Sequence, residues 1–96
     1  MTDYTGQNLT GYSFVGQNLT NANFTNATLT NADLSGCNLT NATFTGADIS
    51  GANLRGTTLT GLVTGSLSTG AGGITTPVLP TGYVIRAGYI VGPSVN

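Results

Sequence analysis

Few side chains in this sequence could perform chemistry, and their types and spacing do not combine into a reactive site. The chain has one cysteine, Cys37, and no histidine, so it cannot form an internal disulfide, a Cys/His zinc site or a His-based catalytic dyad. The only side-chain carboxylates belong to Asp3, Asp33 and Asp48. A catalytic pair of carboxylates requires two of them close together. We therefore expect no enzymatic activity, no cofactor and no metal site.

Charged residues are also too rare for most charged partners. They make up 5% of the 96 residues and give a net charge of −1, whereas an ordinary domain is about 25% charged. Arg55 and Arg86 are the only basic side chains and cannot form the basic stripe that binds a phosphate backbone. We expect no nucleic-acid partner. The sequence also contains no apolar run of ~20 residues and no leader pattern. These absences predict a soluble protein without signal peptide or membrane insertion, cytoplasmic at synthesis and able to join a virion.

The order of the residues is more informative, because the chain from Thr2 to Gly61 repeats every five residues. A small residue, mostly alanine, precedes each large apolar centre by two positions, and Cys37 occupies one of these places. Threonine or serine usually follows the centre, and glycine or asparagine comes next. The twelve centres are Tyr4, Leu9, Phe14, Leu19, Phe24, Leu29, Leu34, Leu39, Phe44, Ile49, Leu54 and Leu59.

A period of five fits neither an α-helix nor a long strand, which repeat every 3.6 and 2.0 residues. A chain that turns a corner every five residues does keep both apolar positions inside. Glycine and asparagine suit the left-handed backbone of such corners. We therefore expect an all-β square coil, and an inert, buried thiol at Cys37.

Segments 32–36 (Ala-Asp-Leu-Ser-Gly), 47–51 (Ala-Asp-Ile-Ser-Gly) and 52–56 (Ala-Asn-Leu-Arg-Gly) resemble the pentapeptide-repeat family. The resemblance covers residues 2–61. It implies a right-handed quadrilateral β-helix with four pentads per coil, and hence about three coils here. Residues twenty apart should then stack. They sort accordingly into one aromatic column, Tyr4, Phe24 and Phe44, and three columns of mainly aliphatic residues.

The two ends of the repeat depart from the pattern. Gln7, Tyr12 and Gln17 replace the small residues of later coils, and we interpret them as an N-terminal plug or a self-association surface. Beyond Gly61 the next centre would be Thr64, so the solenoid is expected to end near Thr60. The predicted organisation is a β-helix over residues 1–61 and an irregular tail over residues 62–96.

The tail is rich in Gly, Ser, Thr and Pro. It resembles the connectors that interrupt pentad runs in long bacterial repeat proteins. Residues 83–92 contain two short β-prone runs, so a small hairpin is expected there. An uncovered β edge promotes aggregation. We hypothesise that the tail covers part of a neighbouring solenoid.

Two sets of exposed polar and aromatic residues are candidates for an interaction surface. The coil should stack Thr20, Thr40 and Thr60 beside Asn18 and Asn38, while the tail supplies Tyr83, Arg86 and Tyr89. One interpretation is structural, because Thr suits an exposed strand and Asn suits a corner. The other is recognition by a flat array of hydroxyl groups.

These features favour a non-enzymatic structural or protein-interaction module. The Thr-, Gly-, Asn-, Ala- and Ser-rich, nearly uncharged composition resembles that of phage capsid-decoration, tail and fibre proteins and of bacterial surface assemblies. We expect a small component of this kind whose partner is protein, either a lattice or further copies of the chain as a homo-oligomer or fibre. One alternative is a DNA-mimicking modulator of DNA gyrase, an activity known in the family but dependent on acidic faces. Another is an ice-binding protein that uses its Thr ladders.

Overall fold

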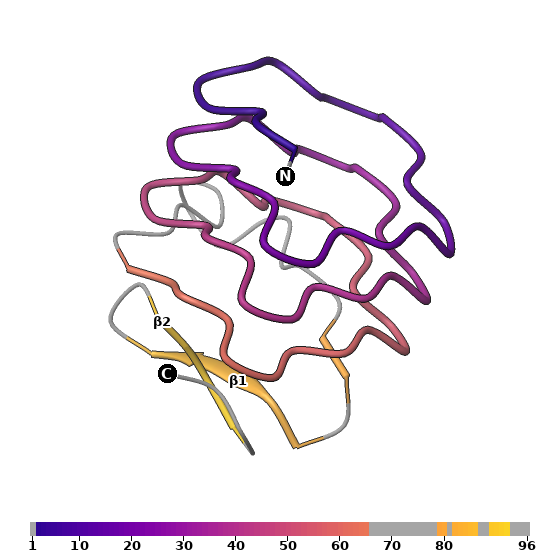
Figure 1. Cartoon of the computed structure of the whole chain (residues 1–96), viewed down its shortest axis with the longest axis vertical. Helices are drawn as coiled ribbons and strands as arrows, with labels where there is room; N and C mark the ends of the chain where they lie inside the picture. Colours follow the sequence, from indigo (N-terminus) through magenta and orange to yellow (C-terminus); the bar gives the residue numbers. More distant parts are fainter. Residues whose placement is uncertain (1, 66–78, 81, 87–88, 93–96) are drawn as a thin grey trace.

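The computed structural model describes residues 2–65, 79–80, 82–86 and 89–92. Up to residue 65 the chain winds into stacked coils, seen from the side in Figure 1. Each pentad contributes one parallel backbone pair that joins residues twenty positions apart, from Asp3 with Asn23 to Thr43 with Val63. The twenty-residue coil predicted from the sorted columns is therefore confirmed.

A tight turn closes each corner of the coil. In the first pentad, the amide of Gln7 donates a hydrogen bond to the carbonyl of Tyr4 at 3.0 Å, which is the span of a β-turn. The corner residues have positive φ angles, for example 69° at Gly6 and 64° at Asn21. Glycine, and to a lesser degree asparagine, tolerates this backbone conformation. The corner residues expected from the sequence are confirmed.

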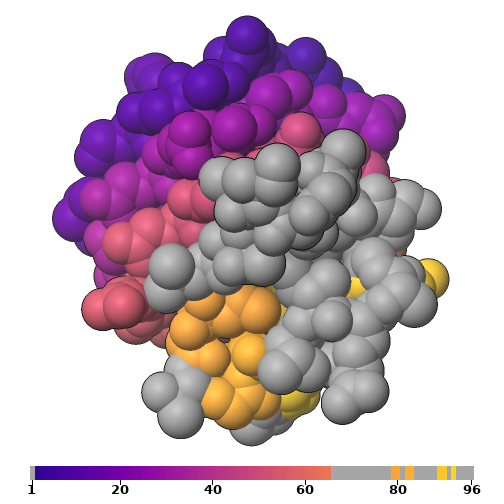
Figure 2. All heavy atoms as spheres, turned by 180° about the vertical axis from the view of Figure 1, so that it is seen from behind, coloured from indigo at the N-terminus to yellow at the C-terminus, as the bar shows by residue number. Residues whose placement is uncertain are grey.

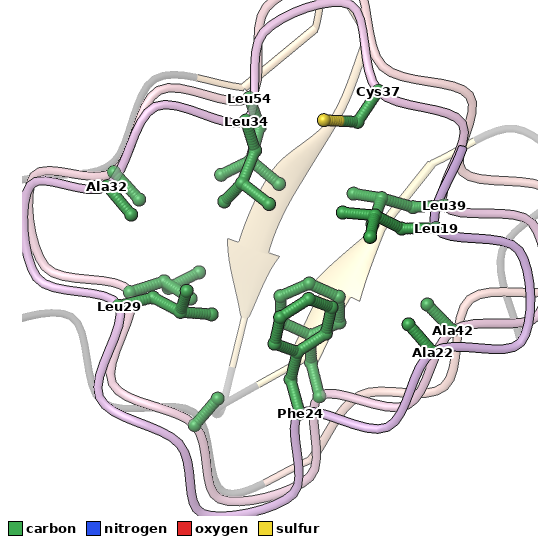
Figure 3. Packing of buried hydrophobic residues seen from close by; sticks show 14 of the residues in the cluster. Leu19, Ala22, Phe24, Leu29, Ala32, Leu34, Cys37, Leu39, Ala42 and Leu54 are labelled. Atoms are coloured by element: carbon green, nitrogen blue, oxygen red, sulfur yellow. The ribbon is translucent and has the colours of Figure 1, made fainter. Parts of the chain in front are cut away.

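Both inward positions of the pentads form the core. The central side chains from Leu9 to Leu59 are at most 6% exposed, and the small residues from Ala22 to Ala52 at most 1%. Figure 3 shows them pointing into the square coil, with Leu34 stacked on Leu54. At about 1.5–3 kcal/mol for each large side chain, burial of the centres is the main stabilising contribution.

The aromatic column also forms as predicted. Phe24 stacks on Phe44 with ring centroids 4.8 Å apart, and Tyr4 stacks on Phe24 at 5.0 Å. Phe14, from the opposite face of the first coil, meets Phe24 edge to face. The aromatic rings therefore link successive coils near the N-terminal end.

The coil continues past the end expected near Thr60. Val63 still pairs with Thr43. Leu62 occupies the inward position that alanine holds in earlier coils, and it is fully buried. An end near Thr60 was expected because the next central position holds Thr64, a polar residue, instead of a large apolar one. This side chain is 7% exposed, and its oxygen accepts a hydrogen bond from the amide of Ile90 at 3.1 Å.

The tail contains the expected hairpin, made of strands β1 (Val84–Arg86) and β2 (Tyr89–Val91). The strands are antiparallel, and the register pairs Val84 with Val91, Ile85 with Ile90 and Arg86 with Tyr89. Residues 87–88, between the two strands, lie outside the described part of the chain.

The hairpin covers the C-terminal end of its own solenoid. Ile90 is 1% exposed and belongs to the same core as the coil, while Leu79 and Tyr83 pack against that core and are partly buried. In Figure 3 both strands lie across the far end of the square. The hypothesis that the tail covers a neighbouring solenoid is therefore wrong for this segment. Ile90 and Thr64 are far apart in sequence, so no repeat pattern indicated their contact.

None of the described residues belongs to a helix long and apolar enough to cross a membrane.

Candidate protein-interaction surface

A recurring pair of side-chain hydrogen bonds fixes the outer residues of the coil. Oδ1 of Asn38 accepts one bond from the amide of Thr40 at 3.1 Å and another from its hydroxyl at 2.6 Å. This two-residue spacing is typical of an Asx turn. The same pair of bonds forms in Asp3–Thr5, Asn8–Thr10, Asn18–Thr20, Asn23–Thr25, Asp33–Ser35 and Asp48–Ser50. Side chains held in this way lose little entropy on binding.

Five of the candidate residues gather on one side of the coil. Asn18 pairs with Asn38 along the backbone, and Asn38 pairs with Thr58. Successive rungs of such a ladder lie about 4.8 Å apart. The three rungs are Asn18–Thr20, Asn38–Thr40 and Thr58–Thr60. In the third rung Thr58 replaces asparagine, so Thr60 cannot make the hydrogen bonds to a carboxamide oxygen that Thr20 and Thr40 make. We call this surface the Asn/Thr face, comprising Asn18, Thr20, Asn38, Thr40 and Thr60.

The Asn/Thr face presents neutral hydrogen-bonding groups. In the first two rungs the Thr hydroxyls donate to Asn oxygens. The groups available to a binding partner are therefore mainly the lone pairs of the Thr hydroxyl oxygens, which accept hydrogen bonds, and the N–H groups of the Asn carboxamides, which donate them. Such a face offers hydrogen-bond donors and acceptors without net charge.

The tail candidates belong to a different part of the molecule. The ring of Tyr89 lies close to Gly65, where the coil ends, and this side chain is 48% exposed. Tyr83 is partly buried against the core. Arg86 lies in β1, and its side chain is outside the described part of the structure. The tail residues therefore lie at the C-terminal end, separate from the Asn/Thr face on the side of the coil.

At the N-terminal end, Gln7, Tyr12 and Gln17 are all exposed. The ring of Tyr12 nevertheless contacts Phe14, with centroids 4.8 Å apart, and Phe14 is fully buried. Tyr12 therefore covers part of the core end, whereas the two glutamines face outward. Both interpretations of this end, plug and self-association surface, remain predictions.

The three aspartates lie on different faces, as predicted. Their bridges place Asp3 beside Asn23, Asp33 beside Ser13, and Asp48 beside Thr28. Hydrogen bonds from the hydroxyl and amide of Thr5 lower the pKa of Asp3, and those of Ser35 lower the pKa of Asp33. All three aspartates accept hydrogen bonds within surface turns, and the lowered pKa favours the ionised form of Asp3 and Asp33. Among the described residues, no cluster of Cys, Asp or Glu could hold a metal ion.

Cys37 is 1% exposed, as expected from its place in the repeat. Its Sγ donates a hydrogen bond to the carbonyl of Phe14 at 2.9 Å, which joins the first two coils. Burial raises the pKa of this thiol. These features disfavour the reactive thiolate.

Comparison with known proteins identifies the family. The family model described as pentapeptide repeats (8 copies) matches residues 5–36 and 22–61. The chain belongs to the pentapeptide-repeat family. A solved structure of a pentapeptide-repeat protein, Rfr23 from the cyanobacterium Cyanothece 51142, is similar to it, with 33% sequence identity and a TM-score of 0.53. The match covers 75% of this chain and 43% of Rfr23, so this chain spans less than half of that protein. Comparison with curated proteins gives no significant match.

In this pentapeptide-repeat protein, sequence reasoning missed two surface features. The first is the series of Asx turns, although the recurrence of Asn or Asp two residues before Thr or Ser could have revealed it. The second is Val15, which is 55% exposed and extends the apolar surface of Tyr12, a residue already singled out from the sequence. The sequence did contain a signal for Val15. In the quadrilateral β-helix, Thr or Ser follows all the remaining centres except Leu54, so an apolar residue at this outward position is unusual.

Proposed function

We propose that this pentapeptide-repeat protein is a non-enzymatic structural module that binds protein surfaces, including further copies of itself. The observation that carries the proposal is the Asn/Thr face. In its first two rungs, the side chains of Asn18 and Thr20 and of Asn38 and Thr40 are fixed in the unbound protein by their own hydrogen bonds. A prearranged surface of this kind binds with a small entropic cost. Its neutral composition suits a component of a virion or of a bacterial surface assembly.

The structure offers less support for the two alternative functions. A gyrase-directed DNA mimic needs rows of carboxylates, but the aspartates of this chain lie on separate faces. An ice-binding ladder needs hydroxyl groups free to order water. In the first two rungs of the Asn/Thr face these hydroxyls already donate to asparagine.

Sedimentation velocity over a wide range of protein concentration tests the proposal. We expect reversible oligomers that become more abundant as concentration rises. Thr40→Lys places a charge in the centre of the Asn/Thr face and should weaken any contact made there. Thr45→Lys, at an exposed position in another column, is the matched control. A monomer at every concentration would contradict self-assembly.

A further inference from the structure

Three outward side chains of the coil depart from its neutral, polar pattern, and they share one face. The outward positions on either side of each centre, over residues 3–60, hold mostly Thr, Ser and Asn. Val15 is the only apolar residue at these positions, and Arg55 is the only basic one. Asp33 lies on the same side of the square. We call this side the third face, and its bridged residues are Ser13, Asp33 and Asn53.

All three side chains are accessible to a partner. Val15 is 55% exposed, Arg55 is exposed and Asp33 is partly exposed. Hydrogen bonds from Ser35 lower the pKa of Asp33 and favour its ionised form. Within residues 2–65, no ion pair neutralises Asp33 or Arg55. The third face therefore presents one charge of each sign, whereas every other face of these coils carries a single aspartate or no charge.

The three residues form a nearly symmetrical triangle. Figure 2 shows successive coils as adjacent bands on the surface of the solenoid. Adjacent rungs lie about 4.8 Å apart, and successive residues of a strand about 3.4 Å. Val15 is one coil before Asp33 and two coils before Arg55, so its backbone lies about 8 Å from the first and about 10 Å from the second. A two-fold axis that exchanges Asp33 and Arg55 therefore passes close to Val15.

From this arrangement we propose that the third face binds the third face of a second copy of the chain, about a two-fold axis beside Val15. The inference rests on the proposed self-assembly and names the surface responsible. In such an isologous contact, Asp33 of each copy meets Arg55 of the other, so two ion pairs form together. The two Val15 side chains meet at the axis and bury their apolar surface against each other.

The charges orient this contact more than they strengthen it. Exposed ion pairs contribute little affinity, but orientations that bring like charges together are penalised. A face of three rungs and five residues covers roughly 14 by 17 Å. Two such faces bury on the order of 500 Å² in total, less than half of what stable specific interfaces bury. We therefore expect a weak dimer, populated at millimolar concentration or where other contacts already hold the copies together.

Two charge-reversed variants test the contact by sedimentation equilibrium. Arg55→Asp leaves two negative charges on the third face, and Asp33→Arg leaves two positive charges. Each variant alone should remain monomeric up to millimolar concentration, because like charges then meet across the axis. An equimolar mixture should form a one-to-one dimer, because both pairs then join opposite charges. Absence of association in the mixture would overturn the proposal.

Asp48→Arg is the matched control for Asp33→Arg. Asp48 also accepts two hydrogen bonds from the serine two residues later, so the substitution removes an equivalent turn and the same charge, but on another face. This variant should dimerise like the unmodified protein and should not pair with Arg55→Asp. Pairing of these two variants would show only general charge attraction and would contradict the third-face contact.

Two further measurements keep the test independent of the fold of one variant. Circular dichroism checks that each variant remains folded. If Asp33→Arg unfolds, Asp33→Asn keeps the acceptor oxygen of the turn, removes the charge and should weaken dimerisation several-fold. Dimerisation of the unmodified protein should also weaken as salt concentration rises, because salt screens exposed charges. Equal dimerisation at low and high salt would contradict the charge pairs.

The outcomes separate this proposal from the proposed function. If oligomers persist in Arg55→Asp but are lost in Thr40→Lys, the Asn/Thr face mediates assembly and the third-face dimer is wrong. If the unmodified protein is monomeric at every concentration, both the dimer and self-assembly are wrong. If the two charge-reversed variants associate only with each other, the third-face dimer is supported.

Discussion

At the scale of single residues, this protein uses polar side chains to fix its own backbone. The carboxamide of Asn38 binds both the amide and the hydroxyl of Thr40, and similar bonds recur around the coil. The sequence predicted which residues face outward. It did not predict these bonds, because Thr and Asn each have sufficient independent reasons to occupy a strand and a corner.

The thiol of Cys37 should resist modification while the protein is folded. It is buried, and its raised pKa keeps it protonated at neutral and mildly alkaline pH, where an ordinary thiol begins to ionise. Labelling with Ellman's reagent should therefore be slow in buffer and fast in urea, with the rate increasing only as the chain unfolds. Equally rapid labelling in both conditions would contradict a buried thiol.

The corner glycines should differ in their sensitivity to substitution. Gly11→Ala and Gly46→Ala both place a side chain at positive φ, at 69° and 72°, which costs about 1–2 kcal/mol. At Gly46 the new Cβ would also collide with the side chain of Asn26, whereas at Gly11 it meets open space. Urea denaturation should show a larger loss of stability for Gly46→Ala. Equal losses would show that Asn26 moves aside freely.

At the scale of structural elements, the pentad and the hairpin were predictable to different extents. The pentad repeats twelve times, so the sequence predicted its corners, its inward positions and its twenty-residue stacking. The hairpin was also expected from its two β-prone runs. Its position on the solenoid was not, because the contact between Thr64 and Ile90 has no counterpart elsewhere in the described residues.

The hairpin should stabilise the solenoid through Ile90. This side chain is 1% exposed, so Ile90→Ala should cost about 2–5 kcal/mol in unfolding free energy. Tyr89→Ala is the neighbouring control and should cost less, because Tyr89 is 48% exposed. Chemical denaturation measures both. A smaller loss for Ile90→Ala than for Tyr89→Ala would mean that the hairpin does not share the core.

At the scale of the whole molecule, the core is a single column that all coils share. Each coil buries its side chains only with the coils above and below, as in other solenoids. The sequence predicted this column through its sorted aromatic and aliphatic positions. It could not predict that Leu62 and Ile90 complete the core at the C-terminal end, because a leucine at position 62 departs from the small-residue rule and Ile90 lies outside the repeat.

A charge in the middle of the column should therefore unfold the entire chain. Leu34 is fully buried in the second coil. Leu34→Asp places a carboxylate among apolar side chains, where it has no partner. Circular dichroism should show loss of the fold, whereas Thr45→Asp, on the exposed surface, should preserve it. Retention of the native spectrum and thermal transition by Leu34→Asp would contradict a shared core.

The twenty-residue spacing of the bridges also affects how this chain can change in length. An in-frame duplication of one pentad in its gene adds one face and preserves the inward pattern, but shifts the starting edge by a quarter turn relative to the hairpin. Four such duplications add a full coil and restore the original alignment. The solenoid can therefore lengthen by single pentads. A continuous column of similar residues on one face, however, is extended in register only when a whole coil is added.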